Sequence, residues 1–212
     1  MPAPMPVKTL AIATACTLAL LIAGCSGKVR YPSYHTLSIA PALKSDASVT
    51  PRPVSVAVRR FETPAYLRQG RIVYSEAPGE IGFYEYHRWA TDPGATVTTA
   101  VVDSLRSSHL FSFVAPYDGH DRPDYLLTGR LVKLDEIDYG GGVKVEAKLS
   151  AELTNLRTGA VVWTGDAAET AKVDNRDVSS VVTEMSHALQ GSIDRLLQSM
   201  QQQVAEANVS AR

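Results

Sequence analysis

Residues 143–154, VKVEAKLSAELT, alternate apolar and polar side chains along their whole length, and this stretch decides the fold. The odd-numbered positions are apolar and the even-numbered positions are polar or charged. Because successive side chains of a strand point to opposite faces, the pattern predicts a strand with one buried and one solvated face, which is typical of antiparallel pairing. Asn155–Gly159 follows as a hairpin loop, and Ala160–Thr164 is the returning strand.

Further strands are predicted on the N-terminal side of this hairpin. Tyr125–Leu134 is apolar at both parities for much of its length, as a central strand covered on both faces would be, and Gly140–Gly142 breaks it. Alternating or β-branched runs predict the remaining strands, with a proline-rich loop and a short helical turn after Pro64 between them. These strands are Tyr34–Ile39, Val54–Phe61 and a hairpin of Arg71–Ser75 with Ile81–Tyr86, and the loop is Pro41–Pro53.

Two helices carry start signals. Asp92 is placed to cap the first free backbone amides, Pro93 takes the first helical position, and apolar residues at three-and-four spacing continue to Ser108–Leu110. A second apolar stripe runs for about thirty residues from an Asp177 cap, and its polar last stretch, Gln198–Gln203, predicts an end that frays or projects toward a partner. The elements predict an α+β fold, a mostly antiparallel sheet with two main helices packed on one face, of which the second is a long C-terminal helix.

The composition describes one globular domain and excludes some functions. The chain has 212 residues, 45% of them hydrophobic, and 21 Lys and Arg against 22 Asp and Glu. A nucleic-acid partner is not expected, because such binding depends on a basic excess that neutralises phosphates. The two cysteines, Cys16 and Cys25, are too few for a disulfide framework or a cysteine-based metal site.

The first 25 residues have the pattern of an export signal. Lys8 is the only charged side chain before Lys28, and the apolar stretch between them is shorter than the roughly 20 residues of a membrane span. Ile22-Ala23-Gly24-Cys25 resembles the bacterial lipobox, in which a peptidase cuts before a lipid-modified cysteine. An uncleaved membrane anchor and an ordinary secretory signal are the alternatives.

The lipobox resemblance implies three segments. Residues 1–24 are then the signal peptide, residues 25–32 the lipidated N-terminus and tether, and residues 33–212 a single domain. Acyl chains on Cys25 hold the mature protein to a membrane without a spanning helix. Ser26 stands where an Asp would retain the protein in the inner membrane, so the expected location is the outer membrane, with the domain facing the periplasm.

The sequence predicts no catalytic residue, no metal site and no cofactor. The five histidines are scattered without a metal-ligand pair, and no G-x-S-x-G motif is present. The glycines at 140–142 lack the Lys-Ser/Thr that follows a phosphate-binding loop, which favours a turn.

Aromatic and arginine residues gather near the middle hairpin. Tyr and Trp interspersed with Arg are typical of protein-binding surfaces. The alternative is that about half of these side chains pack the core beside the sheet. The candidate partner-binding residues are Tyr66, Arg68, Tyr84, Tyr86 and Trp89.

Several short segments, taken in order, resemble the ABC-type transport auxiliary lipoproteins. They are Tyr34–Leu37 soon after the lipobox, Pro64–Leu67 followed by Ile72–Tyr74, Tyr86–Ala90 leading into the first helix, and Asp124–Leu131 with the final hairpin and helix. The loop Arg68–Gly70 departs from the polar-Pro link that is more usual in the family. The resemblance implies a non-enzymatic component of an MCE-type lipid transport system, which docks an MCE-family periplasmic protein at the outer membrane, with a homo-oligomeric ring as a further option.

Two other classes of function remain open on the sequence. One is a structural or regulatory lipoprotein that binds a cell-envelope partner, such as an activator of cell-wall synthesis or a secretion-channel component. The other is a hydrolase with an unusual site. Recovery of an MCE protein by co-purification favours the transport role over the first, and full rescue of a deletion phenotype by variants at each of the five histidines excludes the second.

Overall fold

The structure is a computed structural model, and it describes residues 30–40 and 52–209, with side chains described as far as Val204. Its contacts divide the chain between Tyr31 and Pro32, and the fold belongs to the second unit. The predicted lipidation site at Cys25, most of the predicted tether and most of the predicted loop Pro41–Pro53 lie outside the described residues.

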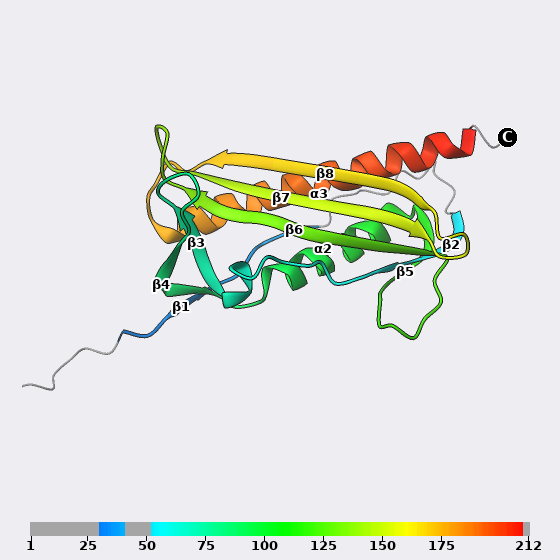
Figure 1. Cartoon of the computed structure of the whole chain (residues 1–212), viewed down its shortest axis with the longest axis horizontal. Helices are drawn as coiled ribbons and strands as arrows, with labels where there is room; N and C mark the ends of the chain where they lie inside the picture. Colours follow the sequence, from blue (N-terminus) through cyan, green and yellow to red (C-terminus); the bar gives the residue numbers. More distant parts are fainter. Residues whose placement is uncertain (1–29, 41–51, 210–212) are drawn as a thin grey trace, which may run out of the picture. The chain divides into compact units, whose positions relative to one another are not determined.

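Three long strands, β6 (Tyr125–Ile137), β7 (Lys144–Asn155) and β8 (Val161–Lys172), form an antiparallel meander (Figure 1). The predicted alternation in β7 is confirmed, because its odd-numbered residues from 145 to 153 are buried and its even-numbered residues are exposed or half-exposed. β8 runs well beyond the predicted Ala160–Thr164. Small residues continue its inner face, and the Trp163 ring covers the backbone of Gly165 on that face.

Strand β6 lies inside the sheet because both of its edges are paired. One edge carries β7, and the other is shared by β2 (Arg52–Val58), a single bridge at Glu62 and β3 (Arg71–Ser75), all parallel to β6. The predicted hairpin is confirmed, since β4 (Gly82–Trp89) pairs antiparallel with β3. The sheet is mixed, and the antiparallel ladders hold most of its paired residues.

Two short strands differ from the sequence prediction. β1 (Ser33–His35), parallel to β4, is shorter than the predicted Tyr34–Ile39. The backbone N–H groups of Ser38 and Ala40 instead donate to side chains of the C-terminal helix, at 3.2 and 2.7 Å. β5 (Phe111–Pro116), parallel to β2, was not predicted, because its buried residues do not alternate.

Helices α2 (Pro93–Ser108) and α3 (Val178–Val209) pack on one face of the sheet and share a core with it. The Asp92 cap is confirmed, since its Oδ1 accepts the N–H of Ala95 at 2.9 Å. His109 ends α2 in the left-handed conformation at φ 52°. In Figure 1, the first part of α3 runs behind the meander.

The end of α3 packs against the sheet, so the expectation that it frays or projects is wrong as far as Val204. Met200 and Val204 are 0% and 5% exposed and continue the apolar stripe at four-residue spacing. The Arg52 guanidinium of β2 donates to the carbonyl of Val204. The sequence places Met200 in the apolar stripe, but the glutamines at 198 and 201–203 around it made this stretch look polar on every side. Among the described residues, no helix combines the length and apolar character needed to cross a bilayer.

Candidate functional site

The candidate partner-binding residues near the β3–β4 hairpin point in different directions. Trp89 is 5% exposed and belongs to the core, so a partner cannot reach its ring. Tyr66, Tyr84 and Tyr86 are half-buried. Arg68, in the short 3-10 helix η2 (Leu67–Gln69), is exposed and donates to the carbonyl of Thr63 at 3.1 Å. The fold therefore presents Arg68 and parts of the tyrosines, whereas Trp89 supports the hairpin from within.

Tyr84 ties the hairpin to the central strand. Its hydroxyl donates to Oε2 of Glu136 on β6 at 2.7 Å, and Glu136 is 6% exposed. Its ring stands edge-on to Tyr74 and His87, with centroids 5.3 and 5.7 Å apart. Burial raises the pKa of Glu136 above its usual value, and burial followed by the bonded Glu136 carboxyl raises the pKa of Tyr84. These contacts stabilise the hairpin against β6, and they do not form an exposed docking surface.

The fold brings together two histidines that the sequence presents as scattered. His35 Nε2 of β1 lies 2.9 Å from His87 Nδ1 of β4, and burial and His87 lower the pKa of His35. Neutral imidazoles can share one hydrogen bond in this geometry. Across residues 30–40 and 52–209, no group of three or more His, Cys, Asp or Glu is arranged to hold a metal ion.

A second buried carboxylate lies on the opposite face of β6. Asp135 is 3% exposed, and its Oδ1 has no hydrogen-bond partner within the described structure. Burial raises its pKa, while the nearby ammonium of Lys133 acts in the other direction. Lys133 itself is bonded to Glu146 at 2.7 Å. Tyr66 packs beside Asp135, and burial followed by that carboxyl raises the pKa of Tyr66. These contacts hold the segment after β2 against the sheet.

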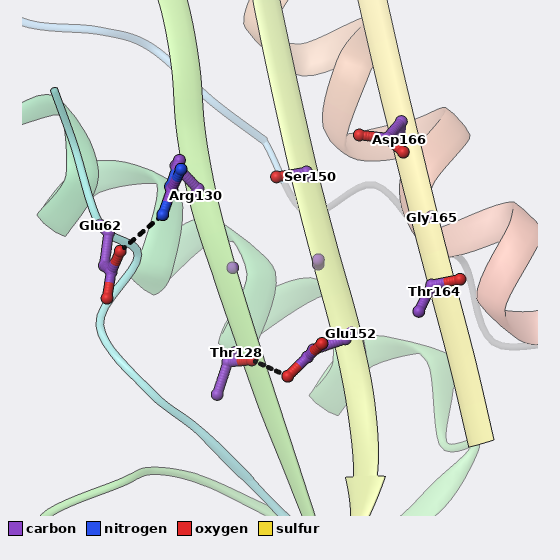
Figure 2. A pocket seen from close by; sticks show the side chains of 10 residues that line it. Glu62, Thr128, Arg130, Ser150, Glu152, Thr164, Gly165 and Asp166 are labelled. Atoms are coloured by element: carbon purple, nitrogen blue, oxygen red, sulfur yellow. Dashed lines mark hydrogen bonds and ion pairs between the residues drawn. The ribbon is translucent and has the colours of Figure 1, made fainter. Parts of the chain in front are cut away.

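The face of the β6–β8 meander that lies opposite the helices carries mostly polar side chains, and we call it the open face. Thr128 donates to Glu152 across β6 and β7 at 3.3 Å, and Arg130 lies 3.3 Å from Glu62 (Figure 2). A shallow depression of about 410 Å³ is centred here. Its lining residues are Glu62, Thr128, Gly129, Arg130, Ser150, Ala151, Glu152, Thr164, Gly165 and Asp166.

Next to the open face, a groove of about 630 Å³ is lined by Arg60, Arg68 and Arg130, and we call it the arginine groove. Arg60 lies 3.1 Å from Asp92, the N-cap of α2. Glu62 and Arg130 line both the groove and the depression, so the two are continuous.

Sequence reasoning singled out Arg68 but missed the other two arginines of the groove. A signal was available for Arg130, which occupies a polar position between the apolar residues of β6. Arg60 lies two residues after the end of β2, where its exposure depends on how the chain turns. Their convergence depends on the tertiary fold, and no local pattern reports it.

The chain is similar to one protein family and to several solved structures. The model of the family described as ABC-type transport auxiliary lipoprotein component matches residues 35–209. Protein XCC0632 from Xanthomonas campestris has a TM-score of 0.72 at 16% identity, covering 83% of this chain and 99% of that one. An uncharacterized protein has a TM-score of 0.60 at 15% identity, covering 81% and 99%.

A more distant structural match is the hypothetical protein CT253 from Chlamydia trachomatis. Its TM-score is 0.51 at 7% identity, covering 72% of this chain and 98% of that one. Identities this low show a shared fold alone. No curated protein matches the chain.

Proposed function

Because the chain belongs to the family of ABC-type transport auxiliary lipoprotein components, we propose that it serves an MCE-type lipid transport system as a docking component at the outer membrane. The protein is an auxiliary lipoprotein component of an ABC-type transport system. The members of this family are not known as enzymes. The match over residues 35–209 carries the proposal, because it spans nearly all of the described domain. Within the family, the intermembrane transport lipoprotein PqiC is the relative whose role the proposal follows.

The membrane link in this proposal is the lipid on Cys25. Several acyl chains hold a protein to a bilayer far more firmly than one chain does. Residues 26–32 separate Cys25 from β1, and seven extended residues reach roughly 25 Å, which keeps the domain near the membrane surface. The domain then offers its surfaces to a periplasmic partner.

The partner surface in this proposal combines the open face, the arginine groove and the exposed parts of Tyr66 and Tyr86. Mixed charges suit recognition of a complementary protein, since they set specificity and association rate. The partner is an MCE-family periplasmic protein. Tyr84 and Trp89 contribute by holding β4 in place, because both rings pack inward.

Site-specific cross-linking tests this role. A photoreactive residue at Thr164 on the open face, or at Arg68, is expected to capture an MCE protein in intact cells. The same group at His187, exposed on α3, is the matched control and should capture much less of it. Capture of a peptidoglycan synthase or a secretion-channel component from Thr164 would instead support the structural or regulatory alternative. Light scattering of the detergent-solubilised protein reports whether it forms the homo-oligomer.

A further inference from the structure

We propose that the arginine groove is a binding site for a phosphate-type anion. Arg60 follows β2, Arg68 lies in η2 and Arg130 lies on β6, so three separate segments bring their guanidinium groups to one groove. Only Glu62 and Asp92 oppose them among the lining residues. The groove is therefore locally positive on a chain whose formal net charge is −1.

The carboxylates that line the groove do not prevent an anion from binding to its arginines. The Glu62 and Arg130 side chains are 70% and 61% exposed, and exposed ion pairs of this kind are weak and readily exchanged. When Glu62 turns into solvent, Arg130 is left with a planar fork that matches two oxygens of a phosphate. The Arg60 side chain is 67% exposed, so its pair with Asp92 is also solvent-accessible and weak.

The start of α2 adds a second source of positive potential. Asp92, the N-cap of this 16-residue helix, lines the groove, so the N-terminal end of α2 adjoins it. Helix N-termini favour anions through the macrodipole, although here Pro93 has no N–H and Asp92 already accepts the N–H of Ala95. Asp92 Oδ1 accepts the N–H of Ala95 at 2.9 Å and also lies 3.1 Å from the Arg60 guanidinium, and the capping bond holds this carboxylate at the helix start.

The size of the groove favours a small ligand over an acidic protein segment. Its volume of about 630 Å³ falls within the roughly 300–1,000 Å³ that is usual for small-molecule sites. Free phosphate and the glycerophosphate headgroup of a phospholipid share the required chemistry. This assignment is tested separately from the docking role, because cross-linking from Thr164 on the open face reports the partner, whereas titration reports what the groove itself binds.

Calorimetric titration of the full lipidated protein in a non-ionic detergent, at fixed ionic strength, tests the assignment. The probes are inorganic phosphate, glycerol 3-phosphate and a short-chain phosphatidylglycerol. We expect saturable binding that Arg60→Gln and Arg130→Gln each weaken about tenfold, because each removes a charge-assisted contact. Arg176→Gln is the matched control, since this arginine is 70% exposed and paired with Asp138 away from the groove.

A gain of binding distinguishes the site from misfolding. Glu62→Gln removes the carboxylate that competes for Arg130, so it is expected to tighten binding several-fold. Equal binding of the first two probes identifies a free-anion site, and binding of the phospholipid alone identifies a headgroup site. The assignment is overturned if no probe saturates, if the groove variants bind like the Arg176 control, or if a glutamate-rich peptide binds more tightly than every probe.

Discussion

Replacing Tyr84 by Phe removes one hydroxyl from the interior of the β3–β4 hairpin. That hydroxyl donates to Glu136 at 2.7 Å, and the carboxylate is 6% exposed, so water cannot easily take its place. A hydrogen bond to a charged group contributes about 1.5–3 kcal/mol. We therefore expect Tyr84→Phe to lower the free energy of unfolding by about 2 kcal/mol at pH 7, which lowers Tm by roughly 4–8 °C for a domain of this size.

The loss should depend on pH. Burial raises the pKa of Glu136 and the Tyr84 hydroxyl opposes that rise. A raised carboxyl pKa means that the folded protein binds the proton more tightly than the unfolded chain, so Glu136 costs stability as pH rises through its folded pKa. Removing the hydroxyl raises that pKa further and enlarges the cost. At pH 4, where Glu136 is mostly protonated in the folded protein, we expect a loss of about 1 kcal/mol, the value for a bond between neutral groups.

Urea unfolding of the lipidated protein in a non-ionic detergent, followed by tryptophan fluorescence at pH 4 and pH 7, measures both losses. Tyr34→Phe is the matched control, because Tyr34 is 64% exposed and its variant should change stability by less than about 0.5 kcal/mol. Equal losses at the two pH values, or an equal loss in the control, would refute the argument that Tyr84 stabilises a buried charge.

Three other substitutions probe different parts of the molecule. Gly129→Ala places a Cβ 2.3 Å from the buried Phe61 ring, so calorimetry should show a loss of about 1–3 kcal/mol, and an unchanged Tm would contradict this packing. His109→Gly relieves a left-handed residue at the end of α2 and should raise stability by about 1 kcal/mol in urea unfolding, whereas a loss would show that the imidazole matters more than the backbone. Cys25→Ala should release the protein from membranes without detergent, and persistent sedimentation with membranes would count against a lipid anchor at Cys25.

Local signals predicted much of the fold. The Asp92–Pro93 start of α2 and the alternation in β7 were readable because capping and side-chain parity depend on neighbouring residues alone. The order of strands beside β6 was not readable. β2 and β3 share one edge of β6 in parallel, and this arrangement depends on contacts between residues as far apart as Val56 and Tyr125.

The candidate surface was less predictable than the fold. Trp89 and Tyr86 have similar amphipathic character, and composition cannot tell which ring enters the core. The buried position of Trp89 follows from its place at the end of β4, against the core. Arg60 and Arg130 belong to separate segments, and only the pairing of β2 and of Glu62 with β6 brings these segments side by side.

The double pairing of β6 imposes an order on folding. β6, β7, β8 and α3 follow one another along the chain, so their contacts close short loops, whereas pairing β2 with β6 closes a loop of about 70 residues. β2 and β3 are synthesised before β6, so the edges that they later pair with β6 stay unpaired until β6 has been synthesised. A nascent chain therefore carries open strand edges that can recruit other chains during synthesis, until β6 has been made and pairs them.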